Sequence, residues 1–205
     1  MRSESLQNFL DVARDAFFAH VDDPRSTESL RRIFTALDTP GAVTDVPGSR
    51  LPVCACLNEG AEGALADASL RPVTESFLRL EPDLRWRTSG DRTNASPGFA
   101  ENHGNTYIVG PGGLERRNDV WLGASLLAPN TRYPDHTHPP EETYLVLSPG
   151  EFMHGSDPWF EPGIGGTFYN SPGVMHAMRS DAKPLLALWA LWAGPRDARK
   201  GKHLS

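Results

Sequence analysis

The chain has 205 residues, of which 39% are hydrophobic and 22% are charged, a composition that supports a buried core and argues against global disorder. The formal net charge is −6, and no stretch is dense in Lys or Arg before the short segment Arg196–Lys202, so no nucleic-acid partner is expected. No apolar run approaches the roughly 18 residues of a membrane span. The polar N-terminus also lacks the apolar core of a signal peptide, so we expect a cytoplasmic protein without membrane contact.

The first part of the chain has the apolar spacing of helices. Apolar residues recur on one helical face between Leu6 and Phe17, and again between Leu30 and Leu37. The sequence Asp22-Asp23-Pro24 is expected to separate these two helices. Two further helices are expected over Leu51–Ala68 and Leu70–Leu80.

From about residue 88 the pattern changes to turn residues and short strands. Short strands at close spacing, separated by Gly, Pro and Asn, predict a sandwich or a barrel. We therefore divide the chain into a helical N-terminal region over 1–100, a β-barrel over 101–195 and a polar tail over 196–205. The expected strands are Thr106–Val109, Val120–Leu127, Glu142–Leu147, Gly166–Tyr169, His176–Arg179 and Leu185–Ala193.

The segment Tyr133–Tyr144 contains four residues that together predict a metal site. His136, His138, Glu142 and Tyr144 all occupy even positions, and side chains at even offsets on a strand share a face. Two Pro residues at 139 and 140 interrupt regular strand pairing, so the alternation is not strict. Two imidazoles and a carboxylate on one face suit Zn²⁺, Fe²⁺, Mn²⁺, Co²⁺ or Ni²⁺.

A second segment, downstream, adds a further potential ligand. Pro172-Gly173 predicts a turn, and the following strand carries His176, which an adjacent strand can bring to the same site. Four protein ligands leave positions open for a substrate oxygen, which is typical of catalytic rather than structural sites. His103 and His154 lie next to Gly and are expected to be loop residues rather than ligands.

These two segments resemble the two motifs of the cupin superfamily. The resemblance rests on His136-x-His138-x-x-x-Glu142, a Gly near position 150, and Pro-Gly-x-x-His176. Departures at Asn130, at Ser180 and in the position of the second motif's Pro affect turns more than ligands. The resemblance implies a mainly β fold with a helical N-terminal part, in which the barrel is a jelly-roll-like double-stranded β-helix. It also implies one divalent metal ion, with zinc, iron and manganese as the alternatives.

Within the cupins, the chain resembles the dimethylsulfoniopropionate (DMSP) lyases of the Q type over about residues 105–195. The similarity rests on the segment Tyr133–Tyr144, on Trp159 with Pro162-Gly163, and on Pro-Gly-Val-Met-His176-Ala-Met. It implies a carbon–sulfur lyase that cleaves DMSP, as its small-molecule substrate, to dimethyl sulfide and acrylate by β-elimination.

The same resemblance assigns roles to individual residues. His138, Glu142 and His176 would bind the metal, and either His136 or Tyr144 would complete the ligand set. Tyr144 would act as the general base, and Tyr133 and His136 would orient the substrate or support the base.

Aromatic side chains are expected to hold the sulfonium cation of the substrate, since aromatic faces attract cations by roughly 0.5–2 kcal/mol each. Trp189 and Trp192 lie on opposite faces of one expected strand, so only one of them can point inside. Trp159, Phe168 and Tyr169 are further candidates.

Two other functional classes remain as alternatives. The first is another small-molecule cupin enzyme, a dioxygenase or an isomerase. A phosphosugar isomerase would need Lys or Arg near the site, and the segment 133–192 has only Arg179 and Lys183. The second is a non-catalytic binding or sensor cupin, although such proteins usually lose a ligand that is present here. Cupins often dimerise through barrel edges, so a homodimer is left open.

Overall fold

The computed structural model describes residues 1–89 and 94–195. The polar tail expected over 196–205, and part of the turn segment between Ser89 and Asn94, lie outside the described residues. Within the described ranges, no helix has both the length and the apolar character needed to cross a membrane.

Four helices precede the main strands, and their ends follow the capping residues. The side chain of Ser3 accepts a hydrogen bond from Leu6 N at the start of the first helix, and Asp23 does the same for Arg25 N at the start of the second. The third helix is shorter than expected, because a 3₁₀ turn occupies Pro52–Cys56. The helices are α1 (Glu4–His20), α2 (Pro24–Leu37), α3 (Leu57–Ala66) and α4 (Arg71–Leu80), followed later by the short α5 (Phe99–Asn102).

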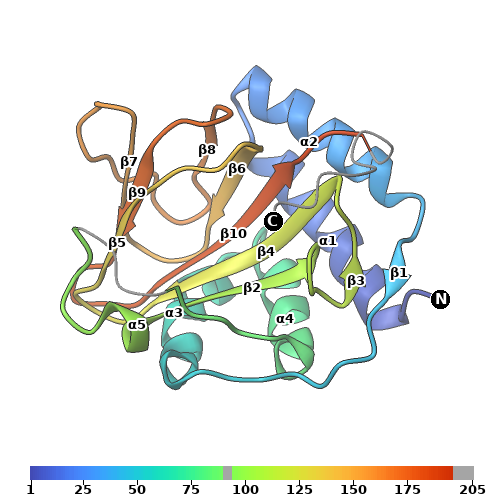
Figure 1. The fold of residues 1–205 in the computed structure, drawn as a ribbon, viewed down its shortest axis with the longest axis horizontal. Coiled ribbons are helices and arrows are strands. Elements are labelled where there is room, and N and C mark those ends of the chain that lie inside the picture. The colour runs from blue at the N-terminus through green and yellow to red at the C-terminus, as the bar shows by residue number, and fades with distance from the viewer. Residues whose placement is uncertain (90–93, 196–205) are drawn as a thin grey trace, which may run out of the picture.

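The strands form two sheets. The larger has seven strands in the order β1-β3-β2-β4-β10-β6-β8, and the smaller has three in the order β5-β9-β7. In bounds, these are β1 (Ala42–Val43), β2 (His103–Val109), β3 (Glu115–Arg116), β4 (Val120–Leu127), β5 (Arg132–His136), β6 (Glu141–Val146), β7 (Glu151–His154), β8 (Thr167–Asn170), β9 (His176–Arg179) and β10 (Leu185–Trp192). The larger sheet lies between the helices and the smaller sheet (Figure 1).

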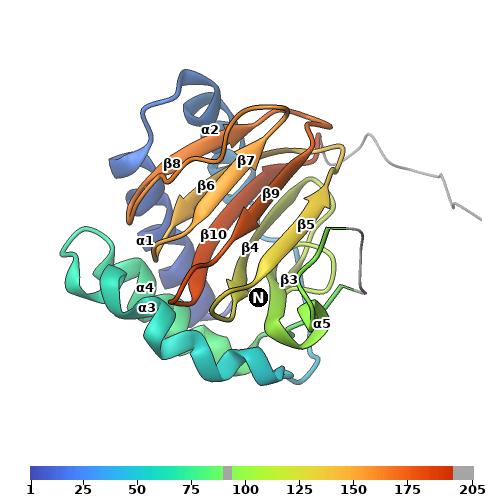
Figure 2. The same ribbon diagram turned by 90° about the vertical axis from the view of Figure 1, so that its left-hand side faces the viewer.

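Both faces of the larger sheet are buried, which explains the almost continuous apolar run of β10. Leu186, Leu188 and Ala190 pack in one core with the helices. Trp189 and Leu191, on the opposite face, pack in a second core with residues of the smaller sheet. Figure 2 shows the strands β5, β9 and β7 lying across the larger sheet, with the helices α1 and α2 behind it.

The predicted mainly β fold with a helical N-terminal part is confirmed. All six expected strands are present, and Val120–Leu127 and His176–Arg179 have the expected bounds. The strands β1, β3, β5 and β7 were not expected, because each has only two to five residues, too few to show a strand pattern. His103 and His154 are therefore strand residues rather than loop residues.

A buried ionic cluster fastens the N-terminus to the larger sheet. Glu115 on β3 is fully buried, and one carboxylate oxygen lies 2.6 Å from Arg2 Nε. The other oxygen accepts a hydrogen bond from Gly41 N at 2.7 Å and lies 3.6 Å from Arg117 Nη1. Burial by itself would raise the pKa of Glu115, but the bonds from Arg2 and Gly41 outweigh it and lower that pKa.

We predict that Glu115→Gln lowers the free energy of unfolding by about 3–5 kcal/mol, because it leaves the buried guanidinium of Arg2 without a counter-charge, whereas Arg117 keeps its ion pair with Asp119. Glu75→Gln, which removes an exposed pair with Arg79, should change it by less than about 1 kcal/mol. Urea denaturation of both variants measures the difference. Since the pKa of Glu115 is lowered by folding, its contribution is complete above its ordinary pKa and is lost as the pH falls through the folded-state value. Equal effects of the two variants would contradict this account.

Candidate active site and metal centre

The predicted ligand residues lie at a corner between the two sheets. β5 ends at His136 and β6 begins at Glu141, so His138 lies in the connection between them. The four even-numbered residues therefore do not share a single strand, in agreement with the interruption expected between them. The physical reason is the Pro pair at 139 and 140, since Pro cannot donate to a strand ladder. Glu142 and Tyr144 do lie on one strand, β6, as the spacing predicted.

His176 reaches the same corner from the neighbouring strand. It begins β9, which pairs antiparallel with β5, and its register partner there is His136. One ring nitrogen from each of His136, His138 and His176 lies within 4.8 Å of the others. Glu142 Oε2 lies 3.4 Å from His138 Nε2 and 3.3 Å from His176 Nε2. The fold thus brings together the three imidazoles and the carboxylate that the sequence singled out.

The hydrogen bonds of the three rings leave the same nitrogen available in each. Every Nδ1 faces a main-chain carbonyl two residues away, and a carbonyl can only accept, so Nδ1 carries the proton and the lone pair is on Nε2. The distances from Nδ1 are 2.9 Å to Pro134 O for His136, 2.9 Å to Pro140 O for His138, and 3.1 Å to Val174 O for His176. This is the arrangement that metal-binding histidines adopt.

The buried Nε2 of His176 makes no hydrogen bond in the described structure. A buried ring nitrogen without such a partner is costly unless something else uses its lone pair. With the neighbouring Glu142 carboxylate, the donor set of imidazole nitrogens and one oxygen suits a divalent transition-metal ion. The residues therefore fit the metal that the cupin resemblance implies.

The charges of the corner favour binding of a cation. Burial and the neighbouring His176 lower the pKa of His136 to about 4. Burial would also lower the pKa of His138, but the bond to Glu142 raises it overall. For Glu142, burial would raise the pKa, and the imidazoles of His138 and His176 outweigh that effect and hold it far below its usual range. At neutral pH the corner therefore contains a carboxylate and a neutral His136.

Asn170, which the sequence did not single out, binds the Glu142 carboxylate at the oxygen that also faces the two imidazoles. It is buried on β8 and is the register partner of Glu142. Its Nδ2 donates to Glu142 Oε2 at 3.1 Å, and its Oδ1 lies 3.3 Å from His154 Nδ1. His154, which was expected in a loop, is thus connected to the Glu142 carboxylate through Asn170. Only the strand pairing reveals this, because the pattern of one strand does not show its partner.

The two predicted catalytic tyrosines lie in different surroundings. Tyr144 is buried on β6, and its ring stacks on Phe168 with centroids 4.9 Å apart. Burial and the nearby carboxylate of Glu142 raise the pKa of Tyr144 well above its usual value. Tyr133 lies on β5 with its ring 4.6 Å from that of His136, and its hydroxyl accepts a hydrogen bond from Asn105 Nδ2 at 3.1 Å.

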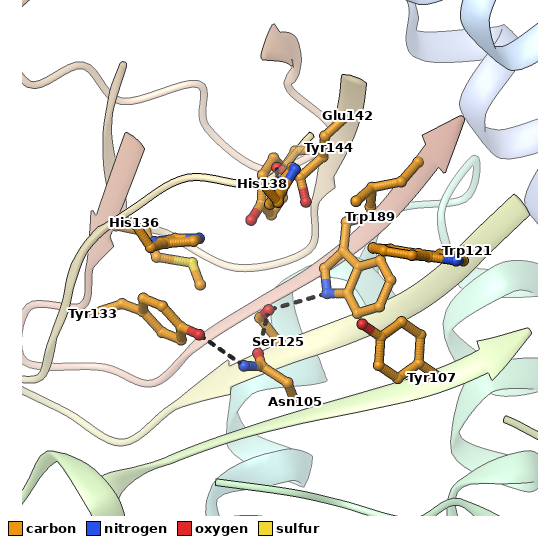
Figure 3. Close-up of a pocket in the computed structure, with 12 residues that line it drawn as sticks. Asn105, Tyr107, Trp121, Ser125, Tyr133, His136, His138, Glu142, Tyr144 and Trp189 are labelled. Carbon is orange, nitrogen blue, oxygen red and sulfur yellow. Dashed lines mark hydrogen bonds and ion pairs between the residues drawn. The ribbon is translucent and has the colours of Figure 1, made fainter. Parts of the chain in front are cut away.

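A cavity of about 170 Å³ joins these groups. On one side lie the predicted site residues, apart from His176, and on the other lies an aromatic wall of Tyr107, Trp121 and Trp189 (Figure 3). The ring centroids of Tyr107 and Trp189 are 5.2 Å apart. A Cβ on Gly123 would come within 2.4 Å of the Trp189 ring, so only Gly leaves room for the indole at this point. The cavity fits a small ligand that is polar at one end and apolar or cationic at the other.

Of the five aromatic residues that the sequence offered as partners of the sulfonium, only Trp189 lines this cavity. Trp192 packs on the helical side of β10, where the Arg32 guanidinium lies 5.8 Å from its ring. Trp159 lies beside two arginines, Phe168 packs behind Tyr144, and the hydroxyl of Tyr169 donates to Glu141. The alternation of side chains on β2 and β4 could have identified the two residues that sequence reasoning missed, Tyr107 and Trp121.

Comparison with known families assigns the chain to one of them. The family described as dimethylsulfoniopropionate lyase matches residues 25–187, which includes most of the helices and nearly all of both sheets. The chain belongs to the dimethylsulfoniopropionate lyase family. The predicted enzyme class, a carbon–sulfur lyase, is thereby confirmed.

Individual relatives agree with this assignment. The chain is 26% identical over 157 residues to dimethylsulfoniopropionate lyase DddQ from Ruegeria pomeroyi, covering 76% of this chain and 75% of that protein. It is 28% identical over 162 residues to a putative dimethylsulfoniopropionate lyase, DddL, from Cereibacter sphaeroides, covering 76% of this chain and 65% of that protein.

Solved structures with the same fold include DMSP lyases. A crystal structure of DddQ from Ruegeria pomeroyi DSS-3 superposes with a TM-score of 0.69 at 22% identity and covers 98% of this chain and 95% of that one. A structure from work on the DMSP lyases RdDddP and RnDddQII gives a TM-score of 0.72, also at 22% identity, with 96% and 95% covered. At this identity the likeness concerns the fold, and it confirms the predicted fold class.

We predict that the purified protein binds one equivalent of Zn²⁺ and that His176→Ala abolishes this binding. Asn170→Ala should weaken it about 10- to 100-fold, as expected for a residue that orients a ligand. His20→Ala, which changes a histidine whose contact is Ser69, should bind Zn²⁺ as the native protein does. Isothermal titration calorimetry of the metal-free proteins measures all three. Native affinity in His176→Ala would exclude His176 as a ligand.

Proposed function

We propose that this protein converts DMSP to dimethyl sulfide and acrylate by β-elimination, with Tyr144 as the general base. The observation that carries the proposal is the cavity in which Tyr144 lines one side with the His and Glu cluster and an aromatic wall forms the other. DMSP has a carboxylate at one end and a sulfonium at the other, so its two charged ends match the two sides.

The metal ligands in this proposal are His138, Glu142 and His176, with His136 or Tyr144 completing the set. Zinc, iron and manganese all suit these donors. When bound there, the ion would act as a Lewis acid toward the substrate carboxylate and would favour the phenolate form of an adjacent tyrosine. Burial raises the pKa of Tyr144. A neighbouring positive charge is therefore needed to favour the phenolate form that can act as a base.

The reaction requires one proton transfer and one bond cleavage. The Tyr144 oxygen takes a proton from the carbon next to the carboxylate, and the electron pair of that C–H bond forms the double bond of acrylate. The bond between the next carbon and sulfur breaks, and its electron pair leaves with sulfur as neutral dimethyl sulfide. Tyr133 and His136 lie together at the edge of the cluster, where they orient the substrate or support the base.

The aromatic wall accounts for recognition of the sulfonium end. Aromatic faces attract a cation by roughly 0.5–2 kcal/mol each, and more strongly where water is excluded. Tyr107, Trp121 and Trp189 all line the cavity on the side away from the His cluster.

The cytoplasmic location, the homodimer and the division of the chain at residues 100 and 195 stay predictions.

We predict that Tyr144→Phe lowers the rate of dimethyl sulfide release from DMSP about 10²- to 10⁴-fold, the usual effect of removing a general base. Tyr169→Phe, which removes a hydroxyl bonded to Glu141, should retain the native rate. Headspace gas chromatography with metal-loaded protein measures the release. Undiminished release by Tyr144→Phe would leave the reaction in place and remove Tyr144 as the base, and release that requires oxygen would support a dioxygenase instead.

We also predict that Trp121→Leu raises the KM for DMSP about 2- to 30-fold, which corresponds to the loss of one cation–π contact. Trp192→Leu is the matched control, since this tryptophan packs toward the helices. Initial rates over a range of DMSP concentrations give both values. An unchanged KM in Trp121→Leu would mean that this ring does not contact the sulfonium.

A further inference from the structure

A line of hydrogen bonds runs from the aromatic wall to Tyr133. Trp189 Nε1 donates to Ser125 Oγ at 3.1 Å, and Ser125 Oγ donates to Asn105 Oδ1 at 2.7 Å. Asn105 Nδ2 then donates to the Tyr133 hydroxyl oxygen at 3.1 Å. Figure 3 shows these four residues, which we call the relay, connecting the two sides of the cavity. Sequence reasoning singled out neither Ser125 nor Asn105.

The direction of the relay is set by its first member. An indole nitrogen can only donate, so Ser125 Oγ accepts from Trp189 and has its own proton left to donate. That proton points to the oxygen of Asn105, and the amide nitrogen of Asn105 therefore faces Tyr133. The Tyr133 oxygen is consequently an acceptor at this contact, and its own proton must be donated elsewhere.

Two acceptors can take that proton, one in the described structure and one on a bound ligand. The first is Ser89 Oγ, which lies 3.3 Å from the Tyr133 oxygen. The second is an acceptor on a ligand in the cavity, because Tyr133 lines the cavity next to His136. A ligand carboxylate is the stronger acceptor of the two, since hydrogen bonds to charged groups are about twice as strong as neutral ones.

The relay is built on the rigid part of the fold. Asn105 and Ser125 are register partners on β2 and β4, and Trp189 lies on the adjoining β10. Tyr133 belongs to β5 of the smaller sheet, so the last hydrogen bond crosses from one sheet to the other. Ser125, Tyr133 and Trp189 are buried, and such polar groups are retained only where their hydrogen bonds are satisfied.

We propose that Ser125 and Asn105 are positioning residues for the lyase reaction. They hold the Tyr133 hydroxyl as a hydrogen-bond donor to the substrate carboxylate, and they hold the Trp189 indole at the sulfonium end. One hydrogen-bonded frame thereby sets the distance between the carboxylate donor and the cation wall, which selects substrates by the separation of their two charges. This inference rests on the proposed function, because it needs a substrate with both charges.

The test uses metal-loaded protein and two readouts, binding of acrylate by calorimetry and the KM and kcat for DMSP. We expect Asn105→Ala to weaken acrylate binding and to raise the KM about tenfold, with a smaller effect on kcat. In a Tyr133→Phe background the same substitution should cost less than about twofold, because the hydroxyl that it orients is already gone. A merely structural role would cost the same in both backgrounds, and that result would overturn the proposal.

Two further variants separate positioning from stability. Ser125→Ala should reproduce the loss seen in Asn105→Ala, and Ser125→Thr, which keeps the hydroxyl, should remain within about threefold of the native protein. Thr106→Val is the matched control, since Thr106 is on the same strand as Asn105 and its hydroxyl donates to Arg85 O. This control should retain native KM, and an equal loss there would overturn the proposal.

The acrylate comparison also distinguishes this inference from the proposed function. If the native protein binds acrylate but releases no dimethyl sulfide, the proposed function fails. The effect of Asn105→Ala on acrylate binding, compared between the native and the Tyr133→Phe backgrounds, still tests the relay. If Ser125→Ala melts far below the native protein by circular dichroism, Asn105→Ala decides the question alone, because Asn105 lines the cavity and is only partly buried.

Discussion

The buried carboxylate of Glu142 is the constraint around which the site is built. A buried charge is tolerated only with close partners, and the Oε2 oxygen of this one has the imidazoles of His138 and His176 and the amide of Asn170 close to it. Each partner arrives from a different segment: the β5–β6 connection, β9 and β8. The pairing of β6 with β8, and of β9 with β5, is therefore as important for the site as the ligand residues themselves.

One face of the larger sheet packs against the helices, and the other face lines the cavity. On one face the helices bury the alternate residues of β10, such as Leu186 and Leu188, in a mainly apolar core. The opposite face presents Trp189, with Asn105 and Ser125 from the adjacent strands. Because these residues lie on paired strands rather than on loops, their positions relative to one another are held by the same backbone ladder. The backbone ladder therefore positions the side chains that line the cavity between the two sheets.

The two tyrosines show how surroundings assign roles. Tyr144 is buried beside a carboxylate that disfavours its ionisation, so its use as a base depends on positive charge close to it. Tyr133 has polar neighbours, accepting from Asn105 and lying near Ser89, and it is suited to donating a hydrogen bond. The neutral His136, whose pKa burial and His176 lower to about 4, lies beside Tyr133 without adding a charge. In the proposed reaction, Tyr144 therefore serves proton transfer and Tyr133 serves orientation.

The sequence by itself determined the helices, the long strands and the identity of the His and Glu cluster, because helical and strand periodicity and ligand spacing are local properties. The spacing from His136 to Glu142, and the turn before His176, predicted residues that the fold brings together. Tertiary structure decided that the cluster lies at a corner between two sheets, and that Asn170, Asn105 and Trp121 belong to the site. These depend on which strands pair and in which register. Register is set by burial on both faces of the sheet, and no single segment of the chain records it.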